Sequence, residues 1–277
     1  MKLVTSGTDR DPEVQHENGQ ETVFRVLNRE VSIAALGALI AALEPLEEEW
    51  PVSSTAIALD TNVFLRLAGH KRSEDIVDYL VSKHEAPIVI PGQVITEFWN
   101  NQLAIVQTVA EGLKKEFDRF KKSVQAIDEE FKMFSDEIEH TLEKFQSEHD
   151  HIYSVPTVHR TRRLLESVQG KAIVPFVNRT RFQSLAEHRY RTKTPPGFMD
   201  EGHGDFFVWA DFLLGLRLAI SKDMGFERAA FVTNEKKVDW SRRDVAHPVL
   251  VAEAWAVSGG PFAIWSLDKL AEKISST

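Results

Sequence analysis

Three acidic stretches, far apart along the chain, contain the side chains best suited to chemistry. Each lies where an expected parallel strand ends or an expected helix begins, and in an open α/β sheet those points converge at the carboxyl edge of the strands. Carboxylates gathered there cannot all stay ionised without a cation. The pattern therefore predicts a divalent-metal site, and its candidate acids are Asp60, Glu97, Asp205, Glu235 and Asp239.

The donor chemistry of this predicted site favours Mg²⁺ or Mn²⁺, because carboxylate oxygens are hard ligands and no cysteine competes for a softer metal. Thr61 and Asn62 follow the first acid and are able to orient it. Each acid also has a plain structural interpretation. Asp60 and Asp205 can be helix caps, Glu97 can be a partner of a helix dipole, and Asp239 can be a turn residue.

Composition sets limits on what the protein can be. The chain has 277 residues, enough for one large domain, and it has no cysteine, which excludes disulfides and cysteine-ligated metal centres. The net charge of −9 argues against nucleic-acid binding over the whole surface but leaves room for a local basic patch. The apolar run 31–43 is too short to cross a bilayer, so we expect a cytoplasmic protein and no membrane partner. That run is either a buried helix or a docking helix.

Short apolar runs alternate with amphipathic segments over much of the chain, which is typical of an α/β protein with a parallel sheet. Residues 1–20 lack periodicity and are expected to be disordered, and a helix over 21–44 belongs to an N-terminal extension reaching residue 50. The main domain is expected over 51–277. The expected strands are 55–59, 87–90, 229–233, 248–252 and 262–265, and the expected helices are 73–83, 205–220 and 266–274.

A different pattern interrupts this alternation between the second and third acidic stretches. Apolar residues recur at alternating spacings of four and three from Val106 to Ile138, and no glycine or proline occurs from Leu113 to Asp150. This heptad pattern predicts a long, coiled-coil-like helical insertion over about 104–190. We favour a hairpin within one chain, because four phenylalanines are unusual in a parallel dimer seam. The alternative is a coiled coil with a second copy or another partner protein.

Residues 156–193 carry positive charge inside an acidic protein, with nine basic residues against two acidic ones. Basic residues interleaved with aromatic and hydroxyl side chains are typical of contact with a phosphate backbone. Alternatively, these arginines pair with the acidic long helix. The candidate nucleic-acid contacts are Arg160, Arg162, Arg163, Arg179, Arg181, Arg189, Arg191 and Lys193, together with Lys236 and Lys237 beside the acids.

Taken in order, five segments resemble the PIN domain nucleases, and more narrowly the larger prokaryotic PIN-like domain family that carries a long helical insertion. The resemblance spans about 55–275 and implies a three-layer α/β/α fold around a central parallel sheet. The segments are Ile57–Leu65, Ile88–Asn101, Pro195–Asp200, His203–Trp209 and Phe231–Trp240.

The resemblance also implies residue roles. The first three family carboxylates match Asp60, Glu97 and Asp205, and the fourth lies between Thr233 and Asp239. The chain departs from the family where Asn234 and Glu235 stand at positions that usually carry Asp, and where Gln102 replaces an expected Arg. Which of Asn234, Glu235 and Asp239 completes the site stays open. The expected metal ligands are Asp60, Glu97, Asp205 and Asp239, and the expected supporting residues are Asn62, Thr233, Asn234 and Asp200.

The leading functional hypothesis from this resemblance is a Mg²⁺- or Mn²⁺-dependent endoribonuclease that leaves 5′-phosphate and 3′-hydroxyl ends. The expected substrate is RNA, with single-stranded DNA as an alternative, and a toxin or defence effector is one setting for this activity. A second hypothesis is a non-catalytic RNA-binding module on a degenerate fold, motivated by Asn234 and Gln102. A third is a protein-interaction subunit that uses the phenylalanine seam and the helix at 31–43.

Overall fold

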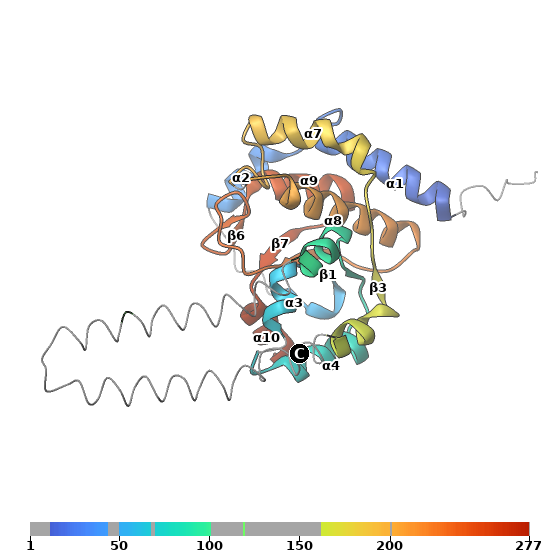
Figure 1. Ribbon diagram of the computed structural model, residues 1–277, viewed down its shortest axis with the longest axis vertical. Helices are drawn as coiled ribbons and strands as arrows, with labels where there is room; N and C mark the ends of the chain where they lie inside the picture. The colour runs from blue at the N-terminus through green and yellow to red at the C-terminus, as the bar shows by residue number, and fades with distance from the viewer. Residues whose placement is uncertain are drawn as a thin grey trace, which may run out of the picture.

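The computed structural model describes residues 12–43, 50–67, 70–100, 119, 162–199 and 201–276. Within them lies a five-stranded sheet of order β3-β2-β1-β4-β7, whose four pairings are all parallel. Helices lie on both sides of this sheet (Figure 1). The predicted α/β class with a central parallel sheet is therefore confirmed. The strands are β1 (Thr55–Leu59), β2 (Ile88–Val89), β3 (Ala172–Ile173), β4 (Arg228–Val232) and β7 (Phe262–Trp265).

Helices and one small ribbon complete the described fold. An antiparallel pair, β5 (Ser241–Arg242) and β6 (Val245–Ala246), precedes the penultimate helix. Residues 92–100 and 162–169 are also helical. The labelled helices are α1 (Pro12–Leu27), α2 (Ala35–Leu43), α3 (Thr61–Leu67), α4 (Ser73–Ser82), α7 (Arg179–Arg191), α8 (Gly204–Ser221), α9 (Pro248–Ser258) and α10 (Leu267–Ser275).

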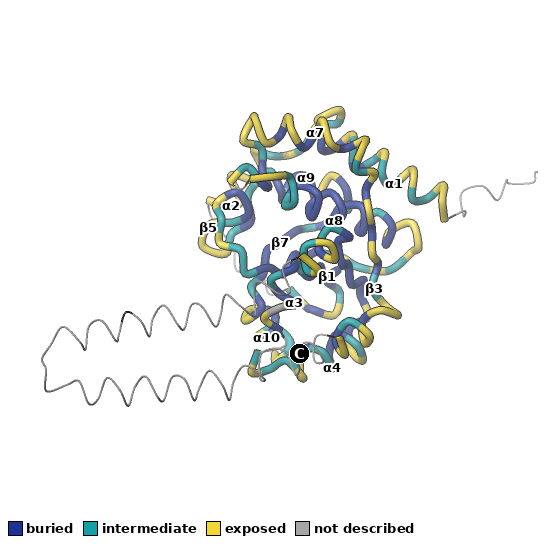
Figure 2. The backbone as a smooth tube through the Cα atoms, in the orientation of Figure 1, coloured by how far each residue is buried: buried dark blue, intermediate teal, exposed yellow. Residues whose placement is uncertain are grey.

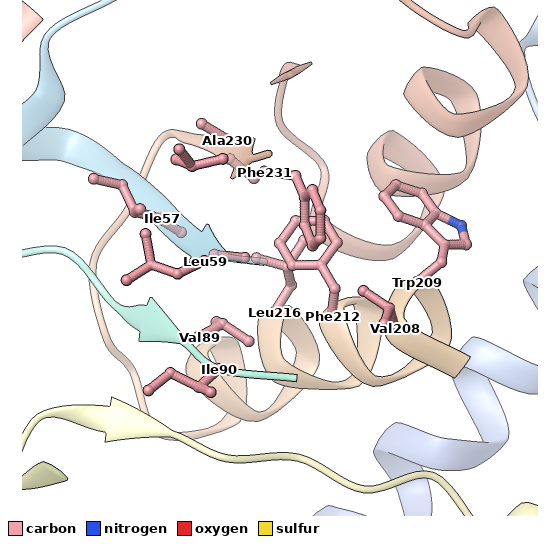
Figure 3. Close-up of a cluster of buried hydrophobic side chains, with 14 of the residues drawn as sticks. Ile57, Leu59, Val89, Ile90, Val208, Trp209, Phe212, Leu216, Ala230 and Phe231 are labelled. Carbon is pink, nitrogen blue, oxygen red and sulfur yellow. The ribbon is translucent and has the colours of Figure 1, made fainter. Parts of the chain in front are cut away.

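Helix α8 lies at the centre of the core. It is apolar on nearly all sides, because β2 and β3 contact one side of it and α1 and α9 contact others. Phe212 and Leu216 of α8 lie beside Phe231 of β4 (Figure 3), and Figure 2 shows the strands and α8 as mostly buried. Gly215 allows α8 to approach β2 as well, because a side chain there would clash with Val89. The middle of α8 is thus packed against the sheet.

The N-terminal helix starts earlier than predicted. Helix α1 begins at Pro12, so the predicted disorder of residues 12–20 is wrong. Val23 and Val26 are buried in the common core, and a side-chain carbon at Gly19 would lie 3.0 Å from Leu214 of α8. Only a few apolar residues of this segment pack against α8. Because the other residues are polar, the sequence pattern did not indicate a helix. The chain then turns at Arg29, whose φ is 61°, and the predicted single helix over 21–44 is two helices.

Helix α2 is the second of these, and it contradicts the interpretation of residues 31–43 as a buried helix. None of its residues is buried, and Leu36 and Leu43 are 72% and 74% exposed. It contacts α9 along one side only. Among the described residues, no helix is long and apolar enough to span a membrane.

Residues 248–252, predicted as a strand, are helical. Pro248 begins α9, and the Nδ1 atom of His247 accepts a hydrogen bond from the backbone N–H of Val249 at 3.2 Å. Proline at the first position and a capping side chain before it favour a helix start. The run was ambiguous because four consecutive apolar residues have no diagnostic period. The strand prediction for 262–265 is confirmed, and Ser266 caps the start of α10.

The predicted insertion over 104–190 extends too far at its C-terminal end. Strand β3 and helix α7 fall inside that range, yet β3 pairs with β2 and belongs to the sheet. The boundary was misplaced because Ala172–Ile173 is too short to register as a strand in a sequence pattern. The heptad seam from Val106 to Ile138, Gln102, Arg160, Asp200 and residues 1–11 lie outside the described residues.

Candidate functional site

The candidate site begins at the carboxyl ends of the adjacent strands β1 and β4. Asp60 follows β1, and Thr233 follows β4, so the parallel pairing brings them together. The Oδ2 atom of Asp60 accepts hydrogen bonds from Thr233 Oγ1 at 2.6 Å and from Asn62 Nδ2 at 2.7 Å. Its Oδ1 atom accepts one from the backbone N–H of Thr61 at 2.7 Å. One carboxylate is thereby fixed at the edge of the sheet.

Burial governs the electrostatics of Asp60. It raises the pKa of this carboxyl from 3.8 to about 6, and repulsion from Glu97 and Glu235 adds to the increase. The hydrogen bonds from Thr233 and the Thr61 backbone act in the opposite direction but do not overcome it. The ionised form is therefore held in surroundings that lack enough positive charge to compensate it.

Glu97 approaches Asp60 from the helix over 92–100. Thr61 links the two acids, because its backbone N–H donates to Asp60 and its hydroxyl donates to Glu97 Oε2 at 3.1 Å. The other carboxylate oxygen, Oε1, accepts from Gln93 Nε2 at 3.2 Å. Burial raises the pKa of Glu97, and Gln93, Thr61 and the cations Lys237 and Arg179 partly offset the rise. Both oxygens of Glu97 are thus oriented by the protein.

Asp205 reaches this site because a glycine precedes it. A side-chain carbon on Gly204 would lie 2.6 Å from Glu97 Oε1, so any other residue there would displace the Glu97 carboxylate from its present position. Asp205 occupies the first turn of α8, and its Oδ2 accepts a hydrogen bond from Trp240 Nε1 at 3.2 Å. Thr61 therefore joins Asp60 to Glu97, and the start of α8, which carries Asp205, lies against Glu97 at Gly204.

The segment after β4 contributes a fourth acid and a lysine. Glu235 Oε1 accepts from the backbone N–H groups of Lys236 and Lys237, at 2.8 and 3.1 Å. The Nζ atom of Lys237 lies 3.1 Å from Glu235 Oε2 and 3.8 Å from Asp205 Oδ2. The backbone N–H of Asn234 donates to Asn62 Oδ1, and its side-chain Oδ1 accepts from the backbone N–H of Leu267, so Asn234 connects Asn62 to the start of α10.

Asp239 lies deeper than the other predicted acids and is fully buried. Its Oδ2 accepts from the backbone N–H of Gly197 at 2.9 Å, whereas its Oδ1 has no hydrogen-bond partner among the described residues. Gly197 has a φ of 91°, and a side-chain carbon there would lie 3.1 Å from the Cβ of Asp205. Asp239 therefore holds the loop at Gly197 against the start of α8. The contact between Asp239 and Gly197 lies beside Asp205.

A further acid, Asp211, did not appear among the predicted site residues. It is fully buried in α8 and pairs with Arg179 at 2.7 Å. It also accepts hydrogen bonds from the backbone N–H groups of Gln93 and Val177, both at 2.8 Å. The sequence signal was available, since Asp211 is a single acid in the middle of an apolar helix, where an unpaired charge is very costly.

The predicted nucleic-acid contacts fall into distinct environments. Arg189 is only 2% exposed and pairs with the buried Glu253, so its guanidinium is not available to a phosphate and we remove it from that surface. Arg162 and Arg181 are engaged by Glu166 and Glu21. Arg179 is bound to Asp211, as described above. Arg162 and Arg181 are nevertheless exposed, and the other exposed members are Arg163, Arg191, Lys193 and Lys236.

The donor set can be tested against a divalent cation. Across the described ranges, no group of three or more His, Cys, Asp or Glu residues surrounds a common point closely enough to be a preformed metal cage. The chemistry nevertheless fits a hard cation. The donors are carboxylate oxygens, the Asp60 carboxyl has a pKa raised by burial, and Gly204 leaves space at Glu97 that any side chain would fill.

The amino-acid sequence matches one known protein family over much of its length. The sequence profile of the family described as PIN like domain matches residues 56–170 and 114–251. The two matches together run from 56 to 251, which is more than half of the 277 residues and includes every acid of the candidate site. No curated protein and no solved structure matches the chain.

Proposed function

Because the chain belongs to the PIN like domain family, within the PIN nuclease superfamily, we propose that it is a metal-dependent endoribonuclease. It would hydrolyse phosphodiester bonds to leave 5′-phosphate and 3′-hydroxyl ends. The observation that carries the proposal is the linkage of three acids at one edge of the sheet. Asp60 and Glu97 share Thr61 as a hydrogen-bond donor, and Gly204 gives Asp205 its place beside Glu97.

Asp60, Glu97 and Asp205 are the residues that would hold Mg²⁺ or Mn²⁺, with Glu235 as the fourth acid. Thr233, Asn62 and the Thr61 backbone fix Asp60 but supply only one hydrogen bond to its Oδ1, which leaves that oxygen able to accept a further ligand. When bound, the ion supplies a water of lowered pKa and positive charge facing the scissile phosphate.

Contacts with RNA would come from the exposed cations near the site. Lys236 directly follows Glu235, and Arg191 and Lys193 are exposed at the end of α7. A protein with a net charge of −9 needs such a local concentration of positive charge to hold a polyanion. The expected site on the enzyme is therefore narrow, with a few phosphate contacts on either side of the acids.

A nuclease assay tests this proposal. Purified protein with Mn²⁺ is incubated with single-stranded RNA and, separately, single-stranded DNA, and the product ends are identified by phosphatase and ligase treatment. We expect RNA cleavage with 5′-phosphate ends, loss of cleavage with a chelator, and a drop of at least ~100-fold for Asp60→Asn. Asp78→Asn, at an exposed acid of α4, is the matched control and is expected to cleave normally. Equal cleavage by the wild type and Asp60→Asn would refute the assignment.

A non-catalytic RNA-binding module is the second candidate, and the Lys237 ammonium supports it. This cation lies 3.1 Å from Glu235 Oε2 and 3.8 Å from Asp205 Oδ2, so a side chain already contributes positive charge between two of the acids. Calorimetric titration separates the two candidates. Binding of RNA without binding of Mn²⁺ favours the module, and saturable Mn²⁺ binding favours the nuclease.

A further inference from the structure

The carboxylate of Asp211 connects three parts of the chain to α8. Its Oδ1 accepts from Val177 N at 2.8 Å and its Oδ2 accepts from Gln93 N at 2.8 Å. Each oxygen also accepts one guanidinium N–H of Arg179, at 2.8 and 2.7 Å. The helix that carries Glu97 is therefore anchored, at its first turn, to the helix that carries Asp205. Only the side chain of Gln93 separates this anchor from Glu97 of the candidate site.

The side chain of Gln93 connects Arg179 to Glu97 of the candidate site. Its Oε1 accepts from Arg179 Nη2 at 3.5 Å, and its Nε2 donates to Glu97 Oε1 at 3.2 Å. The two ends of this amide face partners of opposite kind, because a guanidinium only donates and a carboxylate only accepts. The amide therefore has one favourable orientation, with its NH₂ group toward Glu97.

Arg179 is itself held in place by aromatic side chains. Its guanidinium lies over the ring of Phe207 at 4.6 Å and the ring of Phe176 at 5.7 Å. A bidentate ion pair combined with stacking on a ring fixes both the position and the plane of an arginine. The charge of Arg179 acts on the site, because it helps to lower the pKa of Glu97 against the effect of burial.

We infer that Arg179 and Asp211 position the Glu97 carboxylate through the side-chain amide of Gln93. Glu97 is then clamped at both oxygens, by Gln93 on Oε1 and by Thr61 on Oε2. Without Gln93, Oε1 is free to turn away from the space left by Gly204. The expected effect on metal binding rests on the proposed function. The positioning of Glu97 itself does not depend on a metal.

The decisive variant is Gln93→Met, which keeps the length of the side chain and removes the amide. Its matched control is Gln183→Met. Gln183 Nε2 donates to Glu187 Oε1 at 3.3 Å across the same four-residue helical spacing, but on the exposed face of α7. Both variants are measured for melting temperature, Mn²⁺ affinity by calorimetry, and the crystal structure around Glu97.

We expect Gln93→Met to bind Mn²⁺ ~10-fold more weakly than wild type, because loss of a hydrogen bond that orients a metal ligand has effects of ~10- to 100-fold. Gln183→Met is expected to bind Mn²⁺ normally, and both are expected to melt near the wild-type temperature. Arg179→Lys is expected to weaken Mn²⁺ binding in the same direction, since one ammonium cannot serve both oxygens of Asp211 and the amide of Gln93.

The crystal structure keeps this inference separate from the proposed function. We expect the Glu97 carboxylate of Gln93→Met to leave its position beside Gly204, whether or not the protein binds metal. An unchanged Glu97 in that structure would overturn the inference even if the enzyme cleaves RNA. Absence of Mn²⁺ binding by the wild type, with Glu97 displaced in Gln93→Met, would refute the nuclease and support the positioning.

Discussion

Two arginines of α7 each pair with a buried acid, and the two pairs have different structural roles. Arg189, near the end of the helix, binds Glu253, which also accepts from Trp209 Nε1 at 2.7 Å and pairs with Arg29 at 2.6 Å. Arg179, at the start of the helix, binds Asp211. The Arg189 side chain is 3% exposed and that of Arg179 is 34% exposed.

The difference lies in what each acid connects. Glu253 gathers side chains from α8, α7 and the turn after α1 onto α9, so that centre joins the helical layer. Asp211 instead binds two backbone N–H groups, and one of them, that of Gln93, belongs to the helix that carries Glu97. Clustered positive charge in a sequence therefore does not by itself mark a surface that binds nucleic acid. Here two of its arginines neutralise acids inside the protein.

Replacing Glu253 with Gln is expected to have the largest effect on stability. Arg189 would keep its buried charge without compensation, and removing one partner of a buried pair costs ~3–5 kcal/mol. Urea unfolding followed by tryptophan fluorescence measures this loss. Mn²⁺ affinity of the folded variant should stay within about twofold of wild type, because this centre does not contact the acids. A loss below about 1 kcal/mol, the range of exposed pairs, would contradict the account.

The next largest expected effect is the pH dependence of stability, which arises from Asp60 of the candidate site. The pKa of Asp60 in the folded protein, about 6, is above its ordinary value of 3.8. The folded state therefore holds the proton more tightly, and this group lowers stability as the pH rises from 3.8 to 6. At 1.36 kcal/mol per pH unit, its contribution is about 3 kcal/mol.

Mn²⁺ is expected to offset that loss. The melting temperature should rise with Mn²⁺ near pH 7.5, where Asp60 is ionised, and rise much less near pH 5, where the proton competes with the ion. Melting curves with and without Mn²⁺ at the two pH values measure it. Equal shifts at both pH values would mean that the ion binds away from Asp60.

Asp211→Asn is expected to cost less than Glu253→Gln, at about 2 kcal/mol. Arg179 is partly exposed and can turn toward water when its partner loses charge, whereas Arg189 cannot. Urea unfolding compares the two variants directly. Arg162→Ala, which removes an exposed pair with Glu166, serves as the control and should leave stability unchanged. If Asp211→Asn proves more costly than Glu253→Gln, exposure does not explain the difference between the two centres.

Sequence alone was sufficient for the strand ends that carry Asp60 and Thr233, because buried parallel strands are short apolar runs followed by polar residues. Glu97 and Asp205 were also predictable as acids at helix starts. Asp211 and Glu253 were missed. An acid within an apolar helix signals that a buried partner exists, but the sequence does not show which residue that partner is. Their partners, Arg179 and Arg189, are separated from them by 32 and 64 residues.

The start of α1 was missed for a related reason. Its residues are mostly polar, and its helix is stabilised by Gly19 and Val23 fitting against α8, which no local pattern records. The role of Asn234 was likewise hidden. At the sequence level it replaces an acid, whereas in the fold its backbone N–H binds Asn62 and its side-chain oxygen binds the start of α10.

The most direct measurement is anomalous diffraction from crystals soaked in Mn²⁺. The account predicts a peak bounded by the carboxylates of Asp60, Glu97 and Asp205, and its absence from Asp60→Asn crystals. A protein that cleaves RNA while its crystals bind Mn²⁺ elsewhere, or not at all, would contradict the assignment of these three acids.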